Sequence, residues 1–242
     1  MFPIHDDNPT TMPPVVTVSL IVACTLVFLW QTTLGSEGQQ AIIYALGVIP
    51  ALLFDLKELP PEMAIVPPKA TILTSMFLHG GWMHLIGNML YLWIFGNNVE
   101  EAMGHVRFII FYLICGVMAV FAQALPNPDS EIPMVGASGA IAGVLGAYLL
   151  LYPHAKVLVV IPIGFIIQTM RLPASIVLGF WFVLQFVSNL FASDTGGGVA
   201  FSAHIGGFVA GLALVSFFKR RGVPLFSPAH HDSNHNAGED RF

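Results

Sequence analysis

The chain has 242 residues, of which 55% are hydrophobic and only 10% are charged. A soluble domain carries about 25% charged residues, because it must cover its surface with polar groups. The low charge and the mean hydropathy of +0.76 exclude an ordinary soluble protein and predict a polytopic membrane protein with one compact bundle. The net charge of −5 indicates no particular partner, and nothing in the charge pattern favours nucleic acid binding.

The N-terminal part predicts one spanning helix followed by a long loop. Residues 1–14 contain two acids and no Lys or Arg, so they lack the basic region of a cleaved signal peptide. The apolar run of residues 15–33 is long enough to cross a bilayer, and we expect it to be retained as the first transmembrane helix. Residues 34–69 mix polar residues and prolines with apolar pieces, and we expect short interfacial helices within residues 41–54.

Five more apolar runs predict the rest of an all-α fold with six transmembrane helices. They cover residues 81–97, 108–125, 138–151, 173–191 and 201–218. The run of residues 138–151 is short for a span. We therefore expect this helix to be buried among the others and to begin below the membrane surface.

The segments between and after these helices are less regular. Residues 156–170 begin with β-branched residues but are interrupted by Pro162 and Gly164, and we interpret them as an interfacial loop. Residues 194–198 predict a flexible turn. The polar tail predicts disorder, and we interpret its histidines as solvated rather than metal-binding; they are His230, His231 and His235.

Six spans place both termini on one side of the membrane, and the basic residues indicate which side. With cytoplasmic termini, seven of the nine basic residues lie at cytoplasmic ends and loops: Arg107, Lys156, Arg171, Lys219, Arg220, Arg221 and Arg241. The outer loops then contain only Lys57 and Lys69. The predicted organisation is a cytoplasmic segment (1–14), a domain in the cell (inner) membrane (15–219) and a disordered cytoplasmic tail (220–242).

Three reactive side chains fall at a similar depth in this topology. The second, fourth and sixth helices begin at the outer face, and His84, Ser138 and His204 lie in or near their first turns. A serine hydroxyl is a weak nucleophile unless a base lies beside it. We therefore interpret Ser138 as a nucleophile and His204 as its general base, which predicts hydrolysis inside a membrane.

Small residues near both groups indicate that their helices pack closely. Gly139 and Gly143 form one small-x-x-x-small pair, and Gly207 and Gly211 form another. Such pairs let helix backbones approach each other in lipid. They are compatible with plain packing, and they also allow the hydrogen bond that a serine–histidine dyad requires.

The start of the fourth helix also has features of an oxyanion hole. Ser138 lies at a helix N-terminus, where unpaired backbone N–H groups and the helix dipole favour an anion. His84 and Asn88 share one face of the second helix, and both can donate hydrogen bonds to an oxyanion, although His84 alone also suits a structural interior histidine. The alternative of a zinc site at His79, His84 and His204 is disfavoured by the spacing of the first two and by the lack of an H-E-x-x-H motif.

These motifs resemble those of the rhomboid intramembrane serine proteases. The matching segments are Gly-Ala-Ser-Gly at 136–139, His-Leu-Ile-Gly-Asn at 84–88 and Ala-His-Ile-Gly-Gly-Phe-Val-Ala-Gly at 203–211. Supporting matches are Glu101-x-x-Gly104-x-x-Arg107-Phe108, and Pro173-Ala174 with Trp181 and Gln185. The resemblance covers about residues 69–219, and the ordered set is specific, whereas G-x-S-G alone is weak.

The resemblance implies a Ser138–His204 dyad without a carboxylate and an oxyanion hole formed by His84, Asn88 and the backbone N–H of Ser138. It implies cleavage of transmembrane segments of other membrane proteins near their outer end, with the fifth helix as the lateral gate. The implied partners are these transmembrane substrates and the lipid bilayer, and no cofactor is implied.

Two positions depart from the family pattern. The first loop, residues 34–69, has neither residue of the Trp-Arg pair that many members carry. Ala142 occupies the position at which some members stack a Tyr on the catalytic histidine, so another group must orient His204. Asp194 is a candidate, although a solvated loop acid is the simpler interpretation.

Two other functions remain as alternatives. A non-catalytic rhomboid-like protein would bind or escort client membrane proteins, but such relatives lack the serine or the histidine, and this chain has both. A transporter is disfavoured because the spanning segments lack charged residues and no repeat of interrupted helices is evident.

Overall fold

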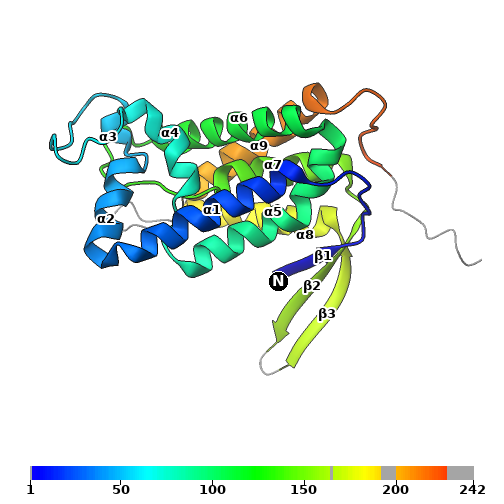
Figure 1. Ribbon diagram of the computed structural model, residues 1–242. Helices are drawn as coiled ribbons and strands as arrows, with labels where there is room; N and C mark the ends of the chain where they lie inside the picture. Colours follow the sequence, from blue (N-terminus) through cyan, green and yellow to red (C-terminus); the bar gives the residue numbers. More distant parts are fainter. Residues whose placement is uncertain (1, 164–165, 192–199, 228–242) are drawn as a thin grey trace, which may run out of the picture.

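Six long helices form the body of the molecule in the part of the chain that the structure describes (Figure 1). The computed structural model describes residues 2–163, 166–191 and 200–227. The helices are α1 (Val15–Thr33), α5 (Trp82–Met103), α6 (His105–Ala124), α7 (Ser138–Leu151), α8 (Ala174–Leu190) and α9 (Phe201–Phe218). Each helix lies where an apolar run predicts one, and α1, α7 and α9 begin and end at the predicted residues.

Three of the described helices, α1, α6 and α9, are long and apolar enough to cross a membrane. Helices α7 and α8 are apolar but shorter. Helix α5 has 22 residues, but polar side chains such as Asn88 and Glu100 interrupt its apolar character. Length and composition in the described part of the chain thus identify three spans rather than the predicted six.

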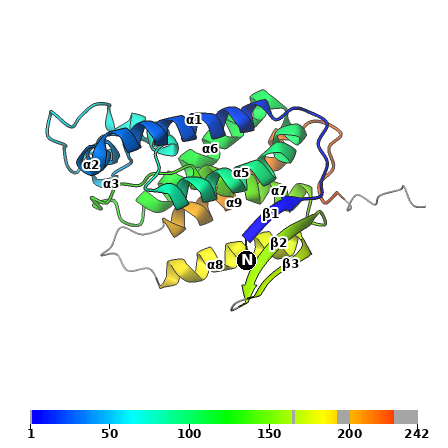
Figure 2. The ribbon, with the colours of Figure 1, turned by 60° about the horizontal axis from the view of Figure 1, so that its bottom comes forward.

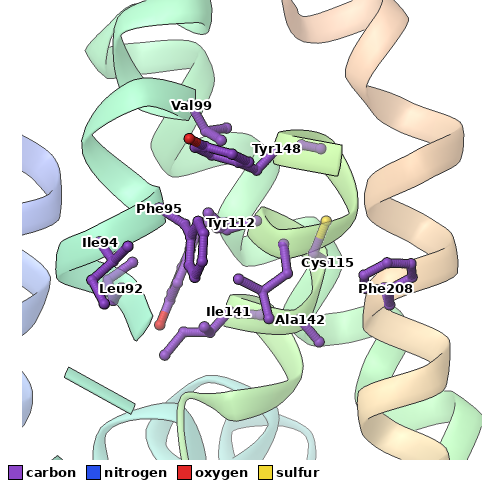
Figure 3. Close-up of a cluster of buried hydrophobic side chains, with 14 of the residues drawn as sticks. Leu92, Ile94, Phe95, Val99, Tyr112, Cys115, Ile141, Ala142, Tyr148 and Phe208 are labelled. Carbon is purple, nitrogen blue, oxygen red and sulfur yellow. The ribbon is translucent and has the colours of Figure 1, made fainter. Parts of the chain in front are cut away.

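Helix α7 packs against α5, α6 and α9, and nearly all of its residues are buried. Figure 3 shows Ile141 and Tyr148 of α7 beside Phe95 of α5, with Phe208 of α9 on the other side. The rings of Phe95 and Tyr148 meet edge to face at a centroid distance of 4.9 Å. The prediction that this short helix is buried among the others is confirmed.

A buried carboxylate ties α1 to α5. The first backbone N–H groups of a helix have no intrahelical partner, and α1 begins after Pro14, which has no capping side-chain bond. Glu100, fully buried on α5, accepts the N–H groups of Val16 at 2.8 Å and Thr17 at 2.7 Å. The carboxylate also contacts His105 at the start of α6, so one side chain joins three helices.

The long first loop is partly helical. It contains α2 (Gly35–Leu46) and α3 (Pro50–Leu53), and three short turns of helix precede α5: η1 (Pro68–Ala70), α4 (Thr71–Thr74) and η2 (Ser75–Phe77). The prediction of short helices within residues 41–54 is confirmed, although α2 begins earlier than expected. These elements gather at the end of the bundle opposite the start of α1 (Figure 1).

The prediction of a wholly α-helical fold is wrong at one end of the bundle. Residues interpreted as an interfacial loop form the antiparallel hairpin of β2 (Lys156–Ile163) and β3 (Ile166–Pro173). The N-terminal segment adds β1 (Phe2–Asp6), which pairs antiparallel with β2, and the strand order is β1-β2-β3 (Figure 2). β-branched residues favour strands, and Pro162 lies beyond Val160, the last residue of β2 that pairs with β1, where a missing N–H is tolerated.

The chain after α9 also differs from the disordered tail that its composition predicts. Arg220 donates its backbone N–H to Ala102 O at 2.8 Å. Phe226 and Ser227 donate theirs to Leu150 O and Leu151 O at 2.7 Å and 2.9 Å, which joins this segment to the last turn of α7. The rest of the tail, including His230, His231 and His235, lies outside the described residues.

The strand β1 carries a buried acid that makes its docking depend on pH. Asp6 accepts the hydroxyl hydrogen of Tyr148 at 2.6 Å. Burial raises the pKa of Asp6 from 3.8 to about 6, although the bond from Tyr148 acts in the opposite direction. The folded protein therefore holds this proton more tightly than the unfolded chain does, and the stability that protonation supplies is lost as the pH rises from about 4 to about 6.

We expect Asp6→Asn, which mimics the protonated acid, to be more stable than the wild type at pH 7.5 by up to about 3 kcal/mol. At pH 3, below the pKa of an unfolded Asp carboxyl, the two proteins are expected to be about equally stable. Thermal unfolding in detergent at both pH values measures this difference. The exposed acid Glu58, in the first loop, provides the control, and Glu58→Gln is expected to keep the wild-type dependence on pH. An unchanged dependence in Asp6→Asn would rule out the buried acid as its source.

Candidate active site

The structure brings Ser138 and His204 into direct contact. Ser138 is the first residue of α7, and His204 lies in the first turn of α9, 66 positions later. The hydroxyl oxygen of Ser138 is 2.8 Å from Nε2 of His204. His204 is only 9% exposed, so its ring is held inside the bundle. Two side chains that the sequence singled out as nucleophile and base are thus hydrogen-bonded neighbours.

Close contact between the α7 and α9 backbones makes this approach possible. A Cβ atom added to Gly207 would lie 2.0 Å from the carbonyl oxygen of Gly139, and one added to Gly211 would lie 2.0 Å from that of Gly143. Both distances are far too short for any side chain, so these positions accept only glycine without a shift of the backbone. The two small-x-x-x-small pairs predicted from the sequence therefore face each other.

The other ring nitrogen of His204 contacts a residue of α8. Gln185 Oε1 lies 2.7 Å from His204 Nδ1, and the ring of Trp181, one turn earlier on the same helix, lies 5.8 Å from the histidine ring. In the sequence both residues are only family-like features, and no contact was predicted for them. Their four-residue spacing places them on one face of a helix, but nothing local identified His204 as the group that this face meets.

Two possible hydrogen-bond donors border the backbone just before Ser138. Asn88 is buried, and its Nδ2 has no hydrogen-bond partner among the described residues. His84 accepts the backbone N–H of Gly80 at Nδ1 at 3.4 Å, which leaves Nε2 as the protonated nitrogen. A Cβ added to Gly136 would lie 2.7 Å from His84 Nε2 and 3.6 Å from Asn88 Nδ2, so both donors lie against Gly136. This close approach, and the φ of +121° at Gly136, explain the glycine two residues before the serine.

A small cavity adjoins Ser138. It has a volume of about 40 Å³, and the residues around it include Ser75, Met76, Gly136, Ser138, Ala140 and Ala203. A cavity of this size is large enough to admit water. The first turn of α7, which borders it, has no capping side chain, so its first backbone N–H groups have no side-chain partner.

His79, one of the residues considered for zinc, has a structural setting. Its ring packs edge to face against His84, with a centroid distance of 5.2 Å, and its Nδ1 lies 3.2 Å from the carbonyl oxygen of Phe77. Burial lowers the pKa of His79 to about 4, so this ring is neutral at pH 7. The described residues contain no group of three His, Cys, Asp or Glu side chains placed to hold a metal. Asp194, the candidate carboxylate partner of His204, lies outside the described residues.

Comparison with known sequences gives one family match. The family model described as "Rhomboid domain" matches residues 69–221, which contain every candidate site residue. The chain is 38% identical over 140 residues to "Rhomboid protease GluP" of Bacillus subtilis, which covers 58% of this chain and 24% of the relative. It is 34% identical over 132 residues to "Rhomboid protein 1, mitochondrial" of Saccharomyces cerevisiae, covering 48% of this chain and 38% of the relative.

A chloroplast relative matches a longer stretch. "Rhomboid-like protein 11, chloroplastic" of Arabidopsis thaliana is 31% identical over 159 residues, which cover 62% of this chain and 52% of that protein. The matched stretches thus span between about a quarter and about half of the relatives' own length. The first of these relatives comes from a bacterium, and the names of the other two assign them to the mitochondrion and the chloroplast.

Proposed function

This chain belongs to the rhomboid family and is an integral membrane protein, and from that premise we propose that it is an intramembrane serine endopeptidase. Its substrates would be membrane proteins cleaved in or near their transmembrane segments. The observation that carries the proposal is the 2.8 Å contact between Ser138 Oγ and His204 Nε2. A serine with a hydrogen-bonded base is the minimal arrangement for nucleophilic attack on a peptide carbonyl.

In the proposed mechanism, Ser138 Oγ attacks the scissile carbonyl carbon while His204 Nε2 takes the hydroxyl proton. Nε2–H then gives that proton to the leaving amine, the peptide C–N bond breaks, and an ester to Ser138 remains. Water attacks this ester, again with His204 as the base. Breakdown of the second intermediate returns the proton to Ser138 and releases the carboxylic acid product.

The donors near Gly136 would stabilise the negative oxygen of both tetrahedral intermediates. His84 Nε2–H and Asn88 Nδ2–H border the same point of the backbone, and the unpaired state of Asn88 Nδ2 leaves it free for a substrate oxygen. Together with the backbone N–H of Ser138 they make the oxyanion hole that we propose. The adjoining cavity of about 40 Å³ offers a place for the attacking water inside an otherwise apolar bundle.

We further propose the membrane topology that the sequence predicts. Helices α1, α5, α6, α7, α8 and α9 all cross the bilayer, with α7 short because protein surrounds it. Residues 15–219 form the membrane domain, which lies in the cell (inner) membrane. Both termini lie in the cytoplasm. Helix α8 is the side through which a substrate helix enters.

The direct test is cleavage of a reporter transmembrane segment by the purified protein in liposomes. We expect the wild type to cleave the reporter and to react with a fluorophosphonate, and we expect Ser138→Ala to do neither. Ser216→Ala, an exposed serine on α9, is the matched control and is expected to behave as the wild type. Binding of the reporter without cleavage by a folded wild type would reject the protease and favour a non-catalytic rhomboid-like protein.

Loss of an oxyanion donor is expected to slow the reaction without preventing binding. We expect Asn88→Ala or His84→Ala to lower kcat by about 10²–10³-fold with little change in KM, because these donors act on the charge of the transition state. Steady-state cleavage of the reporter measures both constants. Asn97→Ala on the same helix, about 13 Å further along, is the control. A rise in KM at constant kcat would place Asn88 and His84 in substrate binding instead.

A further inference from the structure

The ring of His204 is held on two sides by different helices. On one side Nε2 faces Ser138 Oγ at 2.8 Å, and on the other Nδ1 faces Gln185 Oε1 at 2.7 Å. An amide oxygen is an acceptor only. Nδ1 therefore carries the proton and donates it to Gln185, and Nε2 has the free lone pair that accepts the hydroxyl hydrogen of Ser138. A single tautomer, the one needed in a general base, satisfies both bonds.

No carboxylate orients the ring of His204 in the described part of the chain. The hydrogen bonds of His204 side-chain atoms there are those to Ser138 and Gln185 alone. Trp181, four residues before Gln185, presents its ring at a 36° tilt to the histidine ring. An aromatic side chain from α8 thus lies beside the histidine in a chain that has Ala142 where some rhomboids have a stacking tyrosine.

Helix α8 is otherwise the least embedded of the long helices. Its fully buried residues are confined to its first turns: Ala174, Val177 and Leu178. Figure 2 shows α8 at the edge of the bundle below α9. Beyond those turns it contacts α9 through the Gln185–His204 bond, the bond of Ser202 Oγ to Asn189 Oδ1 at 2.8 Å, and aromatic contacts with Phe208.

We propose that Gln185 is the positioning residue of His204: it fixes the ring orientation and the tautomer, and it does so from the peripheral helix α8. This inference rests on the proposed function and adds to it the source of the orientation that a dyad without a carboxylate lacks. Because the orienting oxygen sits on α8, the base is poised for attack while α8 is seated on α9.

The test compares Gln185→Leu with Asn189→Leu. Both remove a polar contact between α8 and α9, but only the first removes a partner of His204. We expect Gln185→Leu to lower kcat for the reporter, and the rate of fluorophosphonate labelling, by about tenfold with little change in KM. We expect Asn189→Leu to keep both rates near the wild-type values. Equal losses in the two variants, or no loss in Gln185→Leu, would overturn the proposal.

A charged replacement gives a readout that a merely structural contact would not move. Gln185→Glu retains an acceptor for Nδ1–H, and its carboxylate favours the protonated imidazole. The acid limb of the kcat–pH profile is therefore expected to move to higher pH, because the active form is the neutral ring. A further titratable side chain at the site is His84 of α5, which lies against Gly136. Helices α7 and α8 have no charged residue, and those of α6, His105 and Arg107, lie at its far end.

The ring can also be observed without any activity. In protein labelled with 15N-histidine, with the His204 signals assigned by their loss in His204→Ala, the wild type is expected to show a protonated Nδ1 and an unprotonated Nε2. Gln185→Leu is expected to show a mixture of both tautomers. If the wild type failed to cleave or label, the proposed function would fall while this spectrum still tested Gln185. An unchanged tautomer in Gln185→Leu would refute the positioning role by itself.

Discussion

Replacing Ser138 with alanine, His204 with alanine, or both together is expected to lower kcat to the same residual level. Each single change is expected to cost at least ~10⁴-fold, because the proposed nucleophile and base would act as one unit and neither would suffice alone. The 2.8 Å contact between the two side chains is the structural basis of this expectation. Reporter cleavage in liposomes over long incubations, with all three variants shown to be folded, provides the measurement.

Comparing the loss of activity in the double variant with the two single losses shows whether Ser138 and His204 act together. If the double variant lost the product of the two single losses, Ser138 and His204 would contribute independently and the dyad would be wrong. If only Ser138→Ala lost activity, another base would have to serve the hydroxyl. His154→Ala serves as the matched histidine control, because His154 is exposed in the turn between α7 and β2. We expect this control to retain the wild-type rate.

The helices and the contact between Ser138 and His204 were predictable because their sequence signals are local. A long apolar run indicates a helix whatever that helix packs against. The first and last residues of α1, α7 and α9 were therefore predicted correctly. Gly207 and Gly211 reported a close backbone contact, since glycine repeats at this spacing are typical of helices that touch in lipid. Ser138 and His204 each lie in the first turn of such a glycine-bearing helix, and that shared position indicated that they meet.

The parts that were missed depend on partners far away in the chain. Strand β2 looked like a broken loop because its pairing with residues 2–6 leaves no local trace. Residues 220–227 have the polar composition of a disordered tail, yet their backbone N–H groups donate hydrogen bonds to the ends of α5 and α7. Gln185 is a single polar residue on an apolar helix. Its contact with His204, 19 residues away in the chain, is evident only in the folded structure.

Adding one methyl group at the contact between α7 and α9 is expected to destabilise the fold and the site together. In Gly207→Ala the new Cβ would lie 2.0 Å from the carbonyl oxygen and 2.9 Å from the carbonyl carbon of Gly139. Both neighbours are backbone atoms, so relief requires the two helices to separate rather than a side chain to rotate. We expect a loss of about 3 kcal/mol in the free energy of unfolding, at the upper end of the range for overpacked cores.

The same separation would lengthen the contact that the proposed mechanism needs. Gly139 directly follows Ser138, and Gly207 lies one turn after His204. Separating the helices at these glycines would therefore also move Ser138 away from His204. Fluorophosphonate labelling is therefore expected to slow in Gly207→Ala even in the fraction that remains folded. Gly211→Ala, a turn further from the site, is expected to destabilise by a similar amount while slowing labelling less.

Gly179→Ala and Gly87→Ala are the matched controls, because nothing lies within 4 Å of a Cβ added at either position. Both are expected to be as stable as the wild type, or more stable by up to ~1 kcal/mol from the higher helix propensity of alanine. Denaturant unfolding in detergent, run beside the labelling assay, separates the two effects. Wild-type stability and labelling in Gly207→Ala would mean that α7 and α9 do not approach this closely, and the 2.8 Å contact between Ser138 and His204 would lose its support.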